Sequence, residues 1–200
     1  DLAGRLMRSA LARIAAPRAA VRLTLTAGSG GRGLDRPEAP AVRLLATAAP
    51  SAKPVGPACL ITSSVRRNEG SPAARLKTLS YLDSVLARAE ARGQGADEAL
   101  MLNSRGQAAC AAAANLFWVR EGRLFTPALD CGVLAGTMRA RVLAVAAGAG
   151  VEAVEVRETP TGAEAMFITN SLIGVRAVST LDGTIFGPSA LVERLAEAIG

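Results

Sequence analysis

Two kinds of hydrophobic spacing alternate along the chain. Apolar residues recur at helical intervals, with polar residues between them, in 2–14, 82–89, 137–147 and 190–199. Alternating or β-branched runs, which are typical of strands, occupy 21–26, 42–47, 59–63, 99–102, 115–119, 123–126, 151–156, 166–169 and 175–180. Glu121-Gly122 and Asp182-Gly183 separate neighbouring strands as tight turns do. The mixture of helices, strands and hairpins predicts an α+β fold with antiparallel or mixed sheets.

One proline-rich segment divides this pattern. Residues 49–57 read Ala-Pro-Ser-Ala-Lys-Pro-Val-Gly-Pro and form the best candidate for a linker. We therefore expect residues 1–48 to be the remainder of a small N-terminal domain and residues 58–200 to be a larger domain. The chain opens inside a helical pattern and not on a methionine. We expect it to be the later part of a longer protein.

Composition narrows the possible chemistry. The chain has no histidine, which excludes Ser-His-Asp and Cys-His catalytic sites and histidine-ligated zinc or haem, and we expect no metal site. Aromatic residues make up 3% of the chain, too few for a stacking platform that binds single-stranded nucleic acid. The net charge of +6 comes from arginines spread along the chain, so we expect no nucleic-acid partner.

The cellular setting follows from hydropathy and cysteine usage. No apolar run of about 18 residues lacks a charge, glycine or proline, so we expect no membrane span. The three cysteines form no Cys-x-x-Cys motif. A reducing cytoplasm is the simplest expectation.

Two segments could react with or bind a ligand through simple physical chemistry. Lys77 lies between leucines just before a helix, and burial there would lower its pKa and create a Schiff-base nucleophile. A solvated lysine at a helix start is the alternative. The glycine turn within 132–139 opens a helix, whose free N–H groups and dipole would favour a phosphate. A plain helix start fits this pattern equally.

Two further segments offer polar contacts. The strand 167–169 ends in Asn170, Ser171 and Leu172, where small polar side chains could hold a phosphate or carboxylate, or simply leave the strand in a turn. The loop 28–33 is glycine-rich but lacks the Gly-Lys-Ser/Thr of a Walker A loop, and no helix follows it. Arg32 in this loop could clamp a substrate carboxylate.

In this order, these segments resemble the class IV aminotransferases, which are fold-type IV pyridoxal phosphate (PLP) enzymes with the D-amino-acid aminotransferase-like fold. The resemblance extends from about residue 21 to the C-terminus. It is strongest to the 4-amino-4-deoxychorismate lyases of that family, because of the Ser-Gly-Gly-Arg-Gly loop and the Ala-Ala-Asn-Leu-Phe-Trp run. The segments that carry it are 28–33, 76–82, 97–106, 113–118, 126–127, 132–139 and 168–172.

The resemblance implies roles for particular residues. Lys77 falls on the lysine that carries PLP covalently and then acts as acid and base, and Tyr81 falls near the phenolic oxygen of the cofactor. Thr137 and Met138 fall on the helix N-terminus that binds the phosphate, and Ser171 falls on a second phosphate contact. Arg32 and Leu172 are the expected substrate contacts.

Two departures from the family pattern stand out. Cys110 occupies the position of the glutamate that keeps the pyridine nitrogen protonated, which predicts a weaker electron sink. An alanine-rich site should raise the pKa of this thiol. The family also has an earlier arginine that grips the phosphate, and Arg5 and Arg8 lie too near the first strand to be that residue.

The resemblance leaves three functions open. The first is a PLP-dependent lyase that converts 4-amino-4-deoxychorismate to 4-aminobenzoate and pyruvate for folate biosynthesis. The second is a class IV aminotransferase that passes an amine from a branched-chain or D-amino acid to a 2-oxo acid. The third is an inactive relative of these enzymes. In the first two cases the intact protein is expected to be a homodimer.

Overall fold

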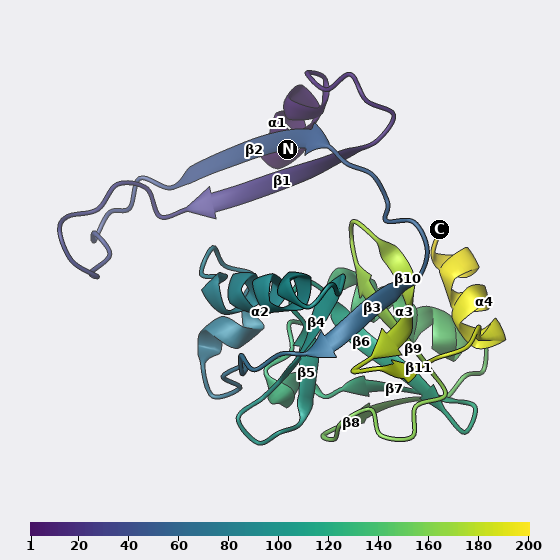
Figure 1. Ribbon diagram of the computed structural model, residues 1–200. Helices are drawn as coiled ribbons and strands as arrows, with labels where there is room; N and C mark the ends of the chain where they lie inside the picture. Colours follow the sequence, from purple (N-terminus) through teal and green to yellow (C-terminus); the bar gives the residue numbers. More distant parts are fainter. The chain divides into compact units, whose positions relative to one another are not determined.

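The computed structural model describes all residues from Asp1 to Gly200 and divides them into two compact units (Figure 1). The units are Asp1–Pro54 and Val55–Gly200. The division falls inside the proline-rich segment, but the expected linker begins too early. Its first two residues, Ala49 and Pro50, pair with the opposite strand and end β2. Proline is tolerated there because the terminal residue of an edge strand need not donate to the ladder.

The N-terminal unit is a helix beside a two-stranded antiparallel hairpin. Its elements are α1 (Leu2–Leu11), β1 (Ala19–Thr26) and β2 (Arg43–Pro50). Asp1 caps the helix by accepting a hydrogen bond from the N–H of Gly4 at 2.8 Å. No residue of this unit is fully buried. A hairpin with one helix has too little apolar surface to form a closed core.

The second unit contains one mixed sheet of nine strands, flanked by helices (Figure 1). The strand order is β5-β4-β3-β10-β9-β6-β7-β8, and β11 pairs with β10. The pairs β3–β4, β3–β10 and β7–β8 are parallel, and the other pairs are antiparallel. The strands are β3 (Ala58–Thr62), β4 (Glu98–Leu102), β5 (Ala108–Ala111), β6 (Asn115–Arg120), β7 (Arg123–Pro127), β8 (Ala153–Val156), β9 (Ala165–Asn170), β10 (Gly174–Leu181) and β11 (Thr184–Ile185). The helices are α2 (Leu82–Gly93), α3 (Thr137–Gly148) and α4 (Ala190–Ile199), with short 3₁₀ turns at Pro72–Arg75 and Leu129–Cys131. The predicted α+β class is confirmed.

Strand alternation builds a core on both faces of the sheet. In β6, Leu116 and Trp118 enter one apolar cluster, while Phe117 enters another that includes side chains of α3 and α4. Phe117 stacks on Phe167 of β9 with ring centroids 5.0 Å apart. Both predicted turns are also present: Glu121 and Gly122 have φ of 51° and 71°, and the Asp182-Gly183 turn has the same left-handed character. Positive φ at both positions is what the right-handed twist of a two-residue hairpin requires.

Helix α2 packs through its small residues. Ser84, Ala87 and Ala91 are buried, and the two alanines pack into a cluster with residues of β4 and β5. The large residues of the same helix lie outside: Leu82 is 67% exposed and Val85 is 59% exposed. The periodicity predicted this helix correctly, but its apolar stripe is not its packing face. No helix of the protein has both the length and the apolar character needed to cross a membrane.

Candidate active site

A cavity of about 310 Å³ lies in the second unit. Pockets of this size commonly accommodate small ligands and cofactors. Its walls come from the turn between β5 and β6, the loop that enters α3, the end of β9 and the segment before α2. The lining residues are Arg67, Lys77, Tyr81, 110–115, 134–138 and 169–171.

Six of the eight residues predicted from the sequence line this cavity. They are Lys77, Tyr81, Cys110, Thr137, Met138 and Ser171. Residues from four segments that are well separated in the chain therefore meet in one place, as the ordered motifs predicted.

The other two predicted residues do not line the cavity. Leu172 follows the last lining residue after β9 and is 44% exposed, with its N–H donating to the Asn170 Oδ1. Arg32 is an exposed residue of the loop between β1 and β2 in the N-terminal unit, whereas every lining residue belongs to the second unit. The substrate contacts expected of both residues remain predictions.

Lys77 is exposed, so the expectation that flanking leucines bury it is wrong. Leu76 is itself 59% exposed, because the segment before α2 crosses the surface without an element covering it. The Lys77 Nζ lies 3.4 Å from the Tyr81 hydroxyl and 5.4 Å from the centroid of its ring. The phenol thus positions the amine at the cavity by a hydrogen bond and a cation–π contact.

The start of α3 is built to receive an anion. Gly136 is its N-cap, with no capping side chain and no acidic residue in the first turn. The first N–H groups of a helix have no acceptor within the helix, and the helix dipole favours negative charge beside them. A Cβ at Gly136 would approach the Asn115 Oδ1 to 2.1 Å, so this position needs a glycine. Asn115 fixes the loop by donating from Nδ2 to the Leu134 carbonyl at 2.9 Å.

Arg67 joins the two loops that frame the cavity. Its Nε donates to the Gly132 carbonyl at 3.0 Å, and its Nη2 donates to the Ala74 carbonyl at 2.6 Å. The first bond holds the loop that leads to α3, and the second holds the turn that leads to Lys77. The sequence shows Arg66-Arg67 as the one arginine pair, but charge patterning alone did not assign it to the site.

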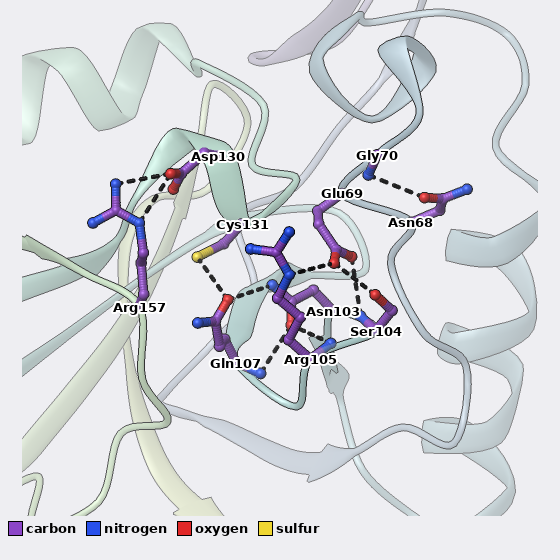
Figure 2. A network of polar contacts seen from close by, with 10 residues as sticks. All are labelled: Asn68, Glu69, Gly70, Asn103, Ser104, Arg105, Gln107, Asp130, Cys131 and Arg157. Atoms are coloured by element: carbon purple, nitrogen blue, oxygen red, sulfur yellow. Dashed lines mark hydrogen bonds and ion pairs between the residues drawn. The ribbon is translucent and has the colours of Figure 1, made fainter.

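A polar network supports these loops from outside the cavity (Figure 2). The buried Glu69 accepts hydrogen bonds from the Ser104 hydroxyl at 2.6 Å and the Ser104 N–H at 3.1 Å, and it pairs with the Arg105 Nε at 3.4 Å. These contacts, the Ser104 hydroxyl above all, lower the pKa of Glu69. Asn103 donates to the Gln107 Oε1 at 2.8 Å in the same turn.

The same network reaches the loop before α3. The buried Cys131 Sγ lies 3.7 Å from the Gln107 Oε1, and next to it Gly132 adopts φ of 88° (Figure 2). A Cβ at Gly132 would meet Arg67 and Glu69 atoms at 3.1 Å. Only glycine combines the left-handed conformation with so close an approach.

Cys110 is buried within a wall of alanines. It is 7% exposed, and burial raises the pKa of its thiol to about 11, as the alanine-rich sequence predicted. The charge of Arg67 opposes this rise and that of Glu98 adds to it. The Cys110 side chain is therefore a neutral thiol near neutral pH.

Sequence reasoning missed three polar lining residues besides Arg67. Asn115 holds the loop before α3, Thr169 donates to the Gly174 carbonyl at 2.7 Å, and Asn170 donates to the Ala113 carbonyl at 2.9 Å. All three lie inside motif segments quoted above, but a sequence does not tell a loop-holding amide from a ligand-binding one.

The electrostatics of the cavity are one-sided. Arg67 and Lys77 are the only charged residues among those that line it, and no carboxylate does. Together with the uncapped N-terminus of α3, they suit a small anionic group that also offers a carbonyl to an amine.

Comparison with known proteins agrees with this geometry. A sequence model of the amino-transferase class IV family matches residues 2–181. An aminodeoxychorismate lyase of Bacillus subtilis is 30% identical over 128 residues, which cover 62% of this chain and 43% of the relative. The chain spans 59% of the length of a relative from Methanocaldococcus jannaschii and 48% of one from Synechocystis.

Solved structures extend the similarity to the fold. The branched-chain amino acid aminotransferase of Escherichia coli is 25% identical with a TM-score of 0.88, covering 96% of this chain and 68% of that one. A thermophile-type relative with the same enzyme name, solved with pyridoxamine 5'-phosphate, is 28% identical with a TM-score of 0.82, covering 90% and 64%. The resemblance predicted from the sequence is confirmed, and the chain belongs to the amino-transferase class IV family.

Proposed function

We propose that the cavity binds PLP and that the intact protein is a PLP-dependent enzyme. The observation that carries the proposal is the pairing of Lys77 with Tyr81, 3.4 Å apart, in the same cavity as the uncapped start of α3. The relative solved with pyridoxamine 5'-phosphate supports a cofactor of this class. The volume, the two cations and the lack of a lining acid also fit a phosphorylated aldehyde.

When bound, PLP supplies an electron-withdrawing ring that stabilises negative charge on the carbon bearing the substrate amine. Lys77 attaches the cofactor and then removes and returns the proton at that carbon. Tyr81 holds the lysine amine. The first N–H groups of α3, at Thr137 and Met138, and the Ser171 hydroxyl bind the phosphate.

The reaction that we favour is the conversion of 4-amino-4-deoxychorismate to 4-aminobenzoate and pyruvate. Lys77 takes the proton from the carbon that bears the amine, and loss of the enolpyruvyl group makes the ring aromatic. The Bacillus subtilis relative carries the name of this lyase, and the Ala-Ala-Asn-Leu-Phe-Trp run within 113–118 favours it. Amine transfer to a 2-oxo acid is the alternative, favoured by the Escherichia coli neighbour.

We also propose that the intact protein is a cytoplasmic homodimer. All three cysteines are free thiols, which suits a reducing compartment. The outer face of α2, formed by Leu82, Val85 and Leu86, is exposed although it is apolar. A second copy of the chain would cover such a face. Sedimentation of the wild type and of Val85→Asp checks this, with the variant expected to dissociate.

An absorption spectrum with PLP tests the cofactor proposal. We expect a visible band that borohydride reduction fixes to Lys77 and that Lys77→Ala lacks. Incubation with 4-amino-4-deoxychorismate should then release 4-aminobenzoate and pyruvate in equal amounts, whereas branched-chain or D-amino acids with a 2-oxo acid would exchange their amine if the alternative holds. A folded wild type without the band would identify the chain as an inactive relative.

A further inference from the structure

The cavity contains no group that would protonate the ring of its cofactor. Among its lining residues, the polar side chains that could meet a ring nitrogen are amides, hydroxyls, a thiol and the cations Arg67 and Lys77. A pyridine nitrogen keeps a proton at neutral pH only when a nearby anion stabilises the charge. This chain offers none within the cavity.

The two buried carboxylates of the protein are committed elsewhere. Glu98 on β4 is 4% exposed, forms an ion pair with Arg88 at 3.1 Å and accepts from the Ala99 N–H. Glu69 is held by Ser104 and Arg105. Neither carboxylate lines the cavity.

The residue expected beside the ring nitrogen strengthens this conclusion. Cys110 is the residue that replaces a glutamate in the family pattern, and its thiol is neutral because burial raises its pKa to about 11. Arg67 acts electrostatically on this thiol, and two backbone carbonyls fix its guanidinium in place. A fixed cation repels a second positive charge on a nearby ring nitrogen.

We propose that this cavity holds the pyridine nitrogen of PLP in its unprotonated form, and that it thereby favours elimination over amine transfer. The proposal rests on the proposed binding of PLP. Amine transfer needs the ring to hold the electron pair until a proton is returned to the cofactor side. In elimination, Lys77 accepts the proton, the carbon–oxygen bond breaks, and the electron pair leaves with the enolpyruvyl oxygen, which takes a proton as pyruvate forms. A weak electron sink therefore penalises transfer more than elimination.

Nitrogen NMR of the full chain loaded with PLP labelled with ¹⁵N in the ring tests the proposal. We expect the wild-type resonance at the downfield position of an unprotonated pyridine. In Cys110→Glu it should move upfield to the protonated position, because the new carboxylate supplies the missing anion. Cys110→Ser, which stays neutral, and Cys59→Ser, which removes a thiol outside the cavity, should leave it unmoved.

A second readout is the rate at which an amino acid converts the bound cofactor to its amine form. Cys110→Glu should raise this rate by at least about tenfold, and Cys110→Ser should not. A protonated nitrogen in the wild type would overturn the proposal and leave PLP binding intact. Failure of the folded wild type to bind PLP would instead overturn the proposed function. Because the wild-type resonance decides the proposal, it remains testable if Cys110→Glu does not fold.

Discussion

The two units are built from the same kinds of element but bury their residues to very different degrees. In the N-terminal unit, a helix and a two-stranded hairpin leave every residue at least partly accessible, and Leu25 in β1 is 69% exposed. In the second unit, β5 is buried along its whole length and β6 along all but its last residue. The difference follows from closure, because only the nine-stranded sheet has helices to cover it.

This contrast explains where the chemistry lies. A cavity needs walls that stay in place when its contents change, and the second unit supplies them with buried strands and loops tied by Arg67 and Asn115. The N-terminal unit supplies the long loop 27–42, and loops of this kind suit contacts that discriminate substrates rather than chemistry itself. Substitutions in the two units should therefore have different kinds of consequence.

The largest expected effect is the loss of the reactive amine in the second unit. Lys77→Ala should lower lyase or transferase activity by at least about 10²- to 10⁴-fold, because attachment and proton transfer both depend on this side chain. Steady-state rates measured with saturating PLP check this. Lys53→Ala, in the N-terminal unit, is the control and should retain activity. A Lys77→Ala enzyme within tenfold of wild type would assign the chemistry to another residue.

The burial contrast itself predicts the next largest effect. Phe117→Ala should lower the free energy of unfolding by about 3–5 kcal/mol, because its ring is fully buried and stacked on Phe167. Leu25→Ala should change it by less than about 0.5 kcal/mol. Urea denaturation followed by circular dichroism measures both. Equal losses would show that the N-terminal unit contributes a core in the intact protein.

Arg32 tests whether the N-terminal unit contributes to substrate binding. If its guanidinium holds a substrate carboxylate, Arg32→Ala should raise KM by an amount equivalent to about 1.5–3 kcal/mol, with PLP binding unchanged. Arg36→Ala, in the same loop, is the matched control. An unchanged KM in Arg32→Ala would confine substrate recognition to the second unit.

The anion-binding start of α3 should be sensitive to a single methyl group. Gly136→Ala places a Cβ 2.1 Å from the Asn115 Oδ1, so either the loop or the amide must move. We expect PLP to bind on the order of tenfold more weakly. Gly148→Ala, at the other end of the helix, meets no atom within 4 Å and should bind PLP normally. Fluorescence titration with PLP compares the two variants.

The smallest effect concerns the network behind the cavity. The pKa of Glu69 is lowered in the folded protein, so its carboxylate stabilises the fold above its unfolded pKa, and this contribution is lost as pH falls through the folded pKa. Ser104→Ala removes the main cause of the lowered value. The variant should be less stable than wild type at about pH 7 and indistinguishable at about pH 3. A deficit that persists in acid would indicate lost packing and not lost charge stabilisation.

The sequence by itself determined the family, the fold class, nearly all element positions and six of the residues that line the cavity. These features depend on local spacing, turn chemistry and ordered motifs, which are properties of short segments. The hairpin turn at Glu121-Gly122 and the helix start after Gly136 are examples, since each needs only its own neighbours.

Only the tertiary structure decided the rest. Whether Lys77 is covered, which face of α2 packs, and what Arg67 holds all depend on segments that lie far apart in the chain. The lack of a carboxylate in the cavity is likewise a property of the whole set of walls. Pattern reports how apolar a face is, but burial depends on which other element approaches it, and the small residues of α2 allow β4 and β5 to approach the face that the pattern did not single out.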